Sequence, residues 1–249
     1  MNIALDISHH APEITVAQFQ RAKARGVSRI VVALNDPDEA KRQIANATEA
    51  GLEVEAYAYL YFAKNIKNQI AADLAIVKGT AVRRIWLDAE DTSSGVTQAS
   101  IIDGLRAAES LVTQAGYRTG IYTASWFWRG HTGNSDRFKH LPLWDAYWDK
   151  SPDIDPVTYG GWTKPAMSQH TPDTHFEGIW CDINSYEPDP LGDVPRFTGT
   201  DYANLTSLLF LGNKYPDGGQ GSVTIKYEKS VSSGSQVTDT FTVTRARKV

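Results

Sequence analysis

The sequence predicts an α/β fold: a single β/α barrel related to the (β/α)₈ type, with a C-terminal β-hairpin extension. Short apolar runs alternate with helix-like stretches through the first half of the chain, which is the order of a parallel sheet. Eight strand-like runs occur in total, the number that closes such a barrel. After the fifth run the helical pattern fades. An open doubly wound sheet is the alternative for this pattern.

The first half of the chain carries the usual signals for strand and helix ends. Thr15 and Gln18 fit a capping box, and Gly26 fits a helix stop. The run at 29–35 is continuously apolar, as expected for a strand covered on both faces. The expected strands are 2–8, 29–35, 54–62, 83–90 and 117–123, and the expected helices are 15–26, 37–50, 66–78 and 97–115.

Three further strands complete the predicted barrel, at 141–148, 164–170 and 177–184. The links between them are rich in Gly, Pro, Asp and Thr, and only 135–140 favours a short helix. The sequence therefore predicts strands without long helices in the last part of the barrel.

The chain from 199 to 249 has a different composition. A Gly-rich break, KYPDGGQGS, precedes SVTIKYEKSV and TDTFTVTRARKV, which both alternate apolar and polar residues. We expect two domains, a catalytic barrel at 1–198 and a short β-rich extension at 199–249. Because two strands alone are marginally stable, self-association through 217–249 is one hypothesis for the extension. Its Lys and Arg residues are also typical of a guarded sheet edge.

Composition excludes several classes of partner. The formal net charge of −4 does not suggest a nucleic-acid partner. No apolar run reaches spanning length and no charged leader precedes an apolar stretch, so we expect neither a membrane partner nor a signal peptide. Cys181 is the only cysteine, so no intrachain disulfide forms.

Acidic residues lie where several predicted strands end. In parallel α/β barrels, catalytic side chains gather at the C-terminal ends of the strands. Asp6 lies near the end of strand one, Asp88 and Glu90 end strand four, and Asp182 lies near the end of strand eight. Comparable rim positions are held by Tyr57, Tyr59, Tyr122, Trp144, Tyr147 and Gln169. We therefore expect one acidic rim with an aromatic lining.

Asp88 and Glu90 stand two residues apart on a strand, so their side chains share a face, with Cα atoms about 6.5–7 Å apart. Like charges this close disfavour ionising both, so the pKa of one should rise. A carboxyl that keeps its proton near neutral pH can serve as the general acid of glycoside hydrolysis. The second carboxylate of such a reaction would be Asp6, Asp88 or Asp182.

Two other interpretations of these acids are open. An Asp at a strand end is often a helix cap or a turn former, and Asp91 before Thr92 and Ser93 fits such a turn. Clustered carboxylates also suit Mg²⁺ or Ca²⁺, with His9 and His10 as further ligands. No helical His pair or Cys pair of zinc spacing accompanies them, and we predict no metal site. Motifs of nucleophile-elbow hydrolases, NTPases and dinucleotide-binding enzymes are absent from the sequence.

Six segments, taken together and in this order, resemble the glycoside hydrolase family 25 lysozymes, the Chalaropsis-type muramidases of bacteria and phages. The similarity runs from about residue 3 to about residue 188. It rests on DIS (6–8), EAYAY (55–59), WLDAED (86–91), GIYTASWFW (120–128), LPLWDAYW (141–148) and the stretch from MSQH to CDIN (167–184).

The resemblance implies a (β/α)₅(β)₃ TIM-like barrel that cleaves the β-1,4 bond between N-acetylmuramic acid and N-acetylglucosamine in peptidoglycan, without a cofactor. It implies Glu90 as the general acid/base, with Asp88 tuning its proton. It implies Asp182 as the nucleophile or stabiliser of an oxocarbenium-like state, and Asp6 as a support of the network. Tyr57, Tyr122, Trp144, Tyr147 and Gln169 would shape the saccharide groove. A phage endolysin, released by a holin or carried by a virion, is the setting that we hypothesise.

The sequence also departs from the pattern of this family. Ala58 stands where the family has a strand-three His, and His170 where a Tyr usually follows Gln169. His9 and His10, the insertion 124–140 and Asp145 are further departures. They motivate two alternative functions: a non-catalytic wall-glycan-binding protein, such as a phage adhesin, on a degenerate barrel, and a barrel glycosidase of another N-acetylhexosamine polymer.

Overall fold

A computed structural model describes residues 1–249 except 9, 12, 188–221, 231–235 and 245–249. Eight strands close into a barrel in the order β1-β2-β3-β4-β5-β6-β7-β8. The strands are β1 (Asn2–Ile7), β2 (Val27–Ala33), β3 (Glu53–Tyr59), β4 (Arg84–Asp88), β5 (Arg118–Thr123), β6 (Leu143–Ala146), β7 (Met167–Phe176) and β8 (Ile179–Tyr186). The predicted barrel is therefore confirmed, and the open-sheet alternative is wrong.

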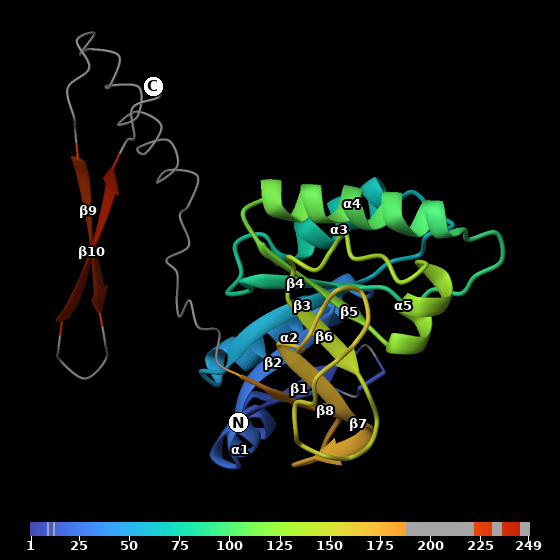
Figure 1. Ribbon diagram of the computed structural model, residues 1–249. Coiled ribbons are helices and arrows are strands. Elements are labelled where there is room, and N and C mark those ends of the chain that lie inside the picture. The colour runs from blue at the N-terminus through green and yellow to red at the C-terminus, as the bar shows by residue number, and fades with distance from the viewer. Residues whose placement is uncertain (9, 12, 188–221, 231–235, 245–249) are drawn as a thin grey trace, which may run out of the picture. The chain divides into compact units, whose positions relative to one another are not determined.

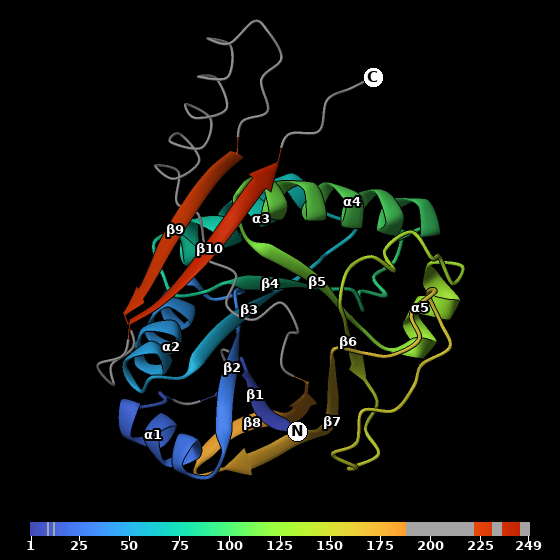
Figure 2. The same cartoon turned by 60° about the vertical axis from the view of Figure 1, so that its left-hand side comes forward.

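Five helices follow the first five strands: α1 (Val16–Ala24), α2 (Pro37–Glu49), α3 (Ile66–Val77), α4 (Gln98–Gln114) and α5 (Ser125–His131). They lie outside the ring of strands, with α1 and α2 next to one another and α3 and α4 side by side (Figures 1 and 2). The arc formed by β6, β7 and β8 is flanked by loops instead (Figure 2). This asymmetry is what the fading helical pattern predicted.

Local signals set the helix starts. The Thr15 side chain accepts a hydrogen bond from the backbone N–H of Gln18, and the Gln18 side chain accepts one from the backbone N–H of Thr15. These two bonds complete the predicted capping box. Asp36 caps α2 by accepting the backbone N–H groups of Asp38 and Glu39. Such caps supply partners for N–H groups that have none within the helix.

The sheet is not wholly parallel, which corrects the sequence-based expectation. β8 runs antiparallel to both β7 and β1. Only Glu177 and Gly178 separate β7 from β8, and both have positive φ, 51° and 80°. Two such residues make a hairpin turn, whereas a parallel return needs a connection of a dozen or more residues.

The fifth helix lies elsewhere than predicted. Residues 135–140 do not form a helix, and the chain instead enters α5 directly after β5. Phe127 and Trp128 of α5 are fully buried, and the Trp128 ring lies 4.9 Å from that of Trp162. Burial of these rings decides the position of the helix, because seven residues are too few to show a clear helical pattern.

Two apolar layers fill the barrel unit. An outer layer packs the strands against the helices. Inside the barrel lies a second cluster, formed by Ala4, Val31, Trp86, Tyr122, Trp144, Met167 and Tyr186. The Trp86 and Trp144 rings meet edge to face with centroids 5.7 Å apart. This aromatic plug closes the interior, so polar chemistry is confined to the two mouths of the barrel.

The chain divides into two compact units, Met1–Arg196 and Phe197–Val249. In the second unit, β9 (Ser222–Ser230) and β10 (Gln236–Thr244) pair antiparallel as the alternating pattern predicts. Among the described residues of both units, no helix has the length and apolar character needed to cross a bilayer.

Candidate active site

A small polar cavity of about 120 Å³ opens at the barrel mouth where the parallel strands end. Its lining consists of carboxyl groups, aromatic rings and one amide: Asp6, Tyr57, Asp88, Glu90, Tyr122, Trp144, Gln169 and Asp182. All four predicted acids and four of the six predicted lining residues thus share one cavity.

The strands place these acids in different ways. Asp88 ends β4, and Glu90 follows two residues later on the same side. Asp6 lies opposite Asp182 in the antiparallel register of β1 and β8. Asp182 therefore comes from the first half of an antiparallel strand rather than from the end of a parallel one. The predicted rim is right, but the predicted strand direction is wrong.

Gln169 joins two of the acids. Its Nε2 donates to both oxygens of Asp6, at 3.2 and 3.1 Å, and to Oδ2 of Asp182 at 2.9 Å. Its Oε1 accepts from the hydroxyl of Tyr122 at 3.0 Å and from the indole of Trp148 at 2.9 Å. Because both ends of the amide are bonded, its orientation is fixed, and it holds Asp6 and Asp182 together.

Asn184 and Trp148 are site residues that the sequence reasoning missed. Asn184 is fully buried, donates to Oδ2 of Asp6 at 2.7 Å and accepts from the Trp144 indole at 2.7 Å. The available signal was its place two residues after Asp182, on the same face of the strand. Trp148 has a largely exposed ring, and only the fold shows that its indole reaches Gln169.

Burial raises the pKa of every acid in the cavity. For Asp6, burial and then the charge of Asp182 raise the pKa to about 8, while hydrogen bonds from Asn184 and Gln169 oppose the rise. Burial and then the charge of Asp182 also raise the pKa of Glu90. Burial is the largest cause of the raised pKa of Asp182 as well, and the N–H of Asp173, 2.7 Å from its Oδ1, opposes that rise.

Asp88 is the most enclosed of the four acids. Burial, followed by the charges of Glu90 and Asp6, raises its pKa well above the ordinary value. Its Oδ1 is inaccessible to solvent and has no hydrogen-bond partner among the described residues. An ionised oxygen in that position would be costly, so burial favours the protonated form of Asp88. The sequence predicted that one pKa of the Asp88–Glu90 pair rises, whereas both are raised.

Comparison with known proteins identifies the barrel. The model for "Glycosyl hydrolases family 25" matches residues 5–179, more than half of the chain. The chain belongs to glycosyl hydrolase family 25. It is thus a glycoside hydrolase of the lysozyme, or muramidase, type.

Curated relatives and solved structures that resemble this chain belong to the same family. "Probable GH family 25 lysozyme 5" of Dictyostelium discoideum is 28% identical in an alignment of 198 positions that covers 75% of this chain and 91% of the relative. The muramidase from Trichobolus zukalii superposes with a TM-score of 0.63 at 21% identity, covering 80% of this chain and all of that one. A family GH25 lysozyme from Aspergillus fumigatus superposes with a TM-score of 0.64 at 19% identity, covering 76% and 95%. At these identities the two structures show the fold.

Four of the departures from the family pattern lie away from the cavity of this family 25 barrel. Ala58 is buried in the outer layer between strands and helices. His10 is exposed, and buried His170 bonds to the hydroxyl of Thr171 at 2.9 Å. Asp145 accepts the Tyr159 hydroxyl. None of these four lines the cavity, and His9 lies outside the described residues.

Two of the six predicted rim residues lie outside the cavity lining. Tyr59 is half-buried and its ring contacts that of Tyr61 at 4.8 Å. Tyr147 is largely exposed after β6. Both would meet a ligand only if it extends beyond the small cavity.

Asp91 is a structural residue, as the turn interpretation predicts. It accepts the backbone N–H groups of Phe62 and Ser93, both at 2.9 Å. Within the part of the chain that the structure describes, no group of three or more His, Cys, Asp or Glu side chains is arranged to hold a metal ion.

Proposed function

We propose that this family 25 enzyme cleaves the β-1,4 bond between N-acetylmuramic acid and N-acetylglucosamine in peptidoglycan, with Glu90 as the general acid/base. The supporting observation is the convergence of four carboxyl groups of raised pKa on one cavity. A glycosidase needs one carboxyl that holds a proton beside another that carries charge.

Glu90 is best suited to donate the proton. It is half-buried at the cavity, whereas Asp88 is enclosed beneath it. Burial and the charge of Asp182 raise the pKa of Glu90 and so favour its protonated form, which can donate to the glycosidic oxygen. The raised pKa of Asp88 favours its neutral form, which keeps a second negative charge away from Glu90.

We assign to Asp182 the role of stabilising the positive charge that develops on the sugar. It is partly accessible, and two donors, Asp173 N–H and Gln169 Nε2, hold its carboxyl group. Asp6 is more deeply buried and bonded by Gln169 and Asn184, so it supports the position of Asp182. A covalent intermediate, an inverting water and help from the substrate's N-acetyl group all remain compatible with this assignment.

Release of reducing ends from purified peptidoglycan tests the proposal. Glu90→Gln should lower kcat by a factor on the order of 10²–10⁴, because a positioned general acid contributes that much. Mass spectrometry after borohydride reduction should show fragments ending in reduced muramic acid. The exposed Glu49, at the end of α2, provides the matched control Glu49→Gln.

Retention of full turnover in a folded Glu90→Gln protein would overturn the assignment of the acid. Saturable wall binding without release by the wild type would favour a glycan-binding function. Release from chitooligosaccharides but not from peptidoglycan would indicate another N-acetylhexosamine polymer. The enzyme acts on the cell wall, and its phage origin stays a prediction of the sequence.

A further inference from the structure

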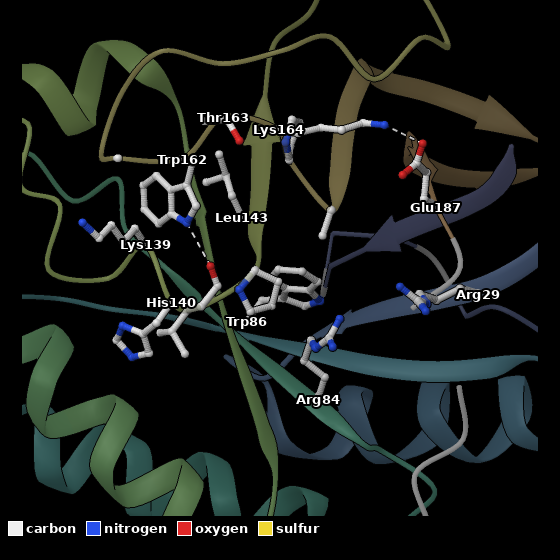
Figure 3. Close-up of a pocket in the computed structure, with 15 residues that line it drawn as sticks. Arg29, Arg84, Trp86, Lys139, His140, Leu143, Trp162, Thr163, Lys164 and Glu187 are labelled. Carbon is white, nitrogen blue, oxygen red and sulfur yellow. Dashed lines mark hydrogen bonds and ion pairs between the residues drawn. The ribbon is translucent and has the colours of Figure 1, made fainter. Parts of the chain in front are cut away.

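The strand pair β7–β8 is regular near one mouth of the barrel and irregular near the other. At the mouth where the parallel strands begin, Lys164 and Glu187 form an ion pair at 2.6 Å (Figure 3). Residues 167–169 then face residues 184–186 one to one. Further along β7 the register shifts twice, between 169 and 171 and between 171 and 174. Such β-bulges often lie next to active sites, where they re-aim a group of the chain.

The second shift lies opposite Asp182. Pro172 and Asp173 of β7 together face this single residue of β8, and we call this pair the β7 bulge. Proline within a sheet is found mainly at edges and bulges, because it has no N–H to donate to a neighbouring strand. Asp173 is therefore the residue of the β7 bulge that can donate a backbone hydrogen bond.

Asp173 has a left-handed backbone conformation, with a φ of 50°. This conformation is uncommon for residues other than glycine, although Asp and Asn adopt it several-fold more often than most. A β-branched residue is strained there, because its side chain crowds the backbone. The local sequence Thr-Pro-Asp-Thr thus places a residue without an N–H next to one that tolerates a positive φ.

The β7 bulge directs the N–H of Asp173 onto Asp182. The donor nitrogen lies 2.7 Å from Oδ1 of Asp182, and Nε2 of Gln169 lies 2.9 Å from Oδ2. Each oxygen of the carboxyl group thus has its own donor, which fixes the plane of the group. Gln169 also bonds Asp6, so its position depends on two acids at once, whereas the Asp173 N–H is held by the backbone of the bulge.

We propose that Asp173 is a positioning residue for glycoside cleavage: its left-handed conformation in the β7 bulge holds Oδ1 of Asp182 and so orients this carboxyl group at the cavity. The inference rests on the role proposed above for Asp182. A hydrogen bond to an ionised carboxyl group stabilises the charged form, which is the form that a developing positive charge requires.

The backbone and the side chain of Asp173 act on Asp182 in opposite directions. Burial raises the pKa of Asp182, the N–H of Asp173 lowers it, and the charge of Asp173 adds a smaller rise. The Asp173 side chain is exposed, so solvent and salt screen its charge. Substitution separates the two effects, because Asn keeps the conformation but removes the charge.

Other titratable groups also interact with Asp182. They come from β1, β3, β5, β8 and the residues after β4, and they are Asp6, Tyr57, Tyr122, Cys181 and Glu90. A substitution at 173 leaves all of them in place. A change in the titration of Asp182 in such a variant therefore reports on the β7 bulge.

Three substitutions at 173 in the full chain test the positioning role. Asp173→Gly and Asp173→Asn accept the left-handed conformation, so kcat for reducing-end release should stay near the wild-type value. Asp173→Val disfavours that conformation and turns the N–H away from Asp182. Its kcat should fall about tenfold with little change in KM, because a hydrogen bond to a charged group contributes about that much. The order of kcat should thus follow tolerance of a positive φ, and neither size nor charge.

Glu177→Val is the matched control. Glu177 lies in the turn of the same hairpin with a φ of 51°, so valine meets the same backbone strain there without a contact to Asp182. This variant should lose stability but keep the wild-type kcat and pH profile.

NMR titration gives a measurement that needs no turnover. In the ¹⁵N-labelled chain, the Asp173 amide signal should shift as Asp182 titrates, and Asp182→Asn should abolish that shift. In Asp173→Val, carboxyl ¹³C signals should show a higher pKa of Asp182, because the bond to its charged form is lost. The acid limb of the kcat/KM profile should move to higher pH in the same variant, but not in Glu177→Val.

Four outcomes would overturn the proposal. They are an unchanged kcat in folded Asp173→Val, equal losses in the Gly, Asn and Val variants, an Asp173 amide that ignores the titration of Asp182, and an equal shift of the acid limb in Glu177→Val. Absence of reducing-end release by the wild type would instead overturn the proposed function. The amide titration would still decide whether the β7 bulge holds Asp182.

Discussion

Gln169 is the residue that links the acids of the cavity to one another. Its one amide nitrogen donates to Asp6 and Asp182, and its oxygen is held by Tyr122 and Trp148. Gln169→Leu keeps much of the volume but removes these bonds. We expect kcat to fall on the order of tenfold to 100-fold, because small displacements of reacting groups have effects of this size.

Steady-state release of reducing ends measures that effect. Gln114→Leu on the exposed face of α4 is the matched control and should be neutral. An unchanged kcat in folded Gln169→Leu would show that Asp182 holds its position without the amide.

The raised pKa of Asp6 predicts how the stability of the fold depends on pH. Burial, with the charge of Asp182, raises its pKa in the folded protein to about 8, above the value near 4 of an unfolded chain. The folded state therefore binds this proton more tightly. The resulting stabilisation is full below about pH 4 and is lost as the pH rises through about 8.

Urea unfolding across this pH range checks the sign. The free energy of unfolding of the wild type should fall more steeply with pH than that of Asp6→Asn. Asp103→Asn, at an exposed position of α4, should keep the wild-type slope. Parallel curves for wild type and Asp6→Asn would contradict the raised pKa.

At the scale of single elements, β5 must approach the aromatic plug closely. A Cβ on Gly120 would lie 2.4 Å from the Trp86 ring and 3.2 Å from the Pro142 carbonyl oxygen. Both neighbours belong to the packed barrel, so neither can move freely. We expect Gly120→Ala to lower the free energy of unfolding by about 1–3 kcal/mol, the usual cost of overpacking.

Gly130 in α5 provides the matched control for that measurement. A Cβ there meets no atom within 4 Å, and alanine favours a helix by about 0.5–1 kcal/mol over glycine. In urea unfolding, Gly120→Ala should therefore lower the free energy of unfolding, and Gly130→Ala should raise it. A similar loss for both would indicate that glycine at 120 matters for a reason other than the Trp86 ring.

At the scale of the whole molecule, the barrel unit closes on itself. Its eight strands pair in a full ring within Met1–Arg196. We expect a chain truncated after Arg196 to unfold cooperatively near the wild-type midpoint and to release reducing ends at the wild-type rate per molecule. An aggregated or inactive fragment would show that the barrel needs the second unit.

Self-association through 217–249 stays a prediction at this scale. The strands β9 and β10 form a two-stranded sheet, and such a sheet alone is marginally stable. Light scattering of the full chain and of a chain without 217–249 tests it. Equal protomer counts in both would argue against assembly through this segment.

The sequence by itself determined the barrel, most of its elements and the set of acids. Alternation of apolar runs with amphipathic stretches is local information, and the capping residues Thr15 and Gln18 mark a helix start without any tertiary contact. The placement of Asp6, Asp88 and Glu90 at strand ends followed from the same local pattern.

Only the tertiary structure decided the direction of β8, the position of α5 and the bonding within the site. These depend on contacts between residues far apart in the chain. The bond of Asn184 to Asp6 joins the two ends of the barrel unit, and that of Trp148 to Gln169 runs from the loop after β6 to β7. Local periodicity carries no information on such pairs, because hydrogen bonding and burial become fixed only when the barrel closes.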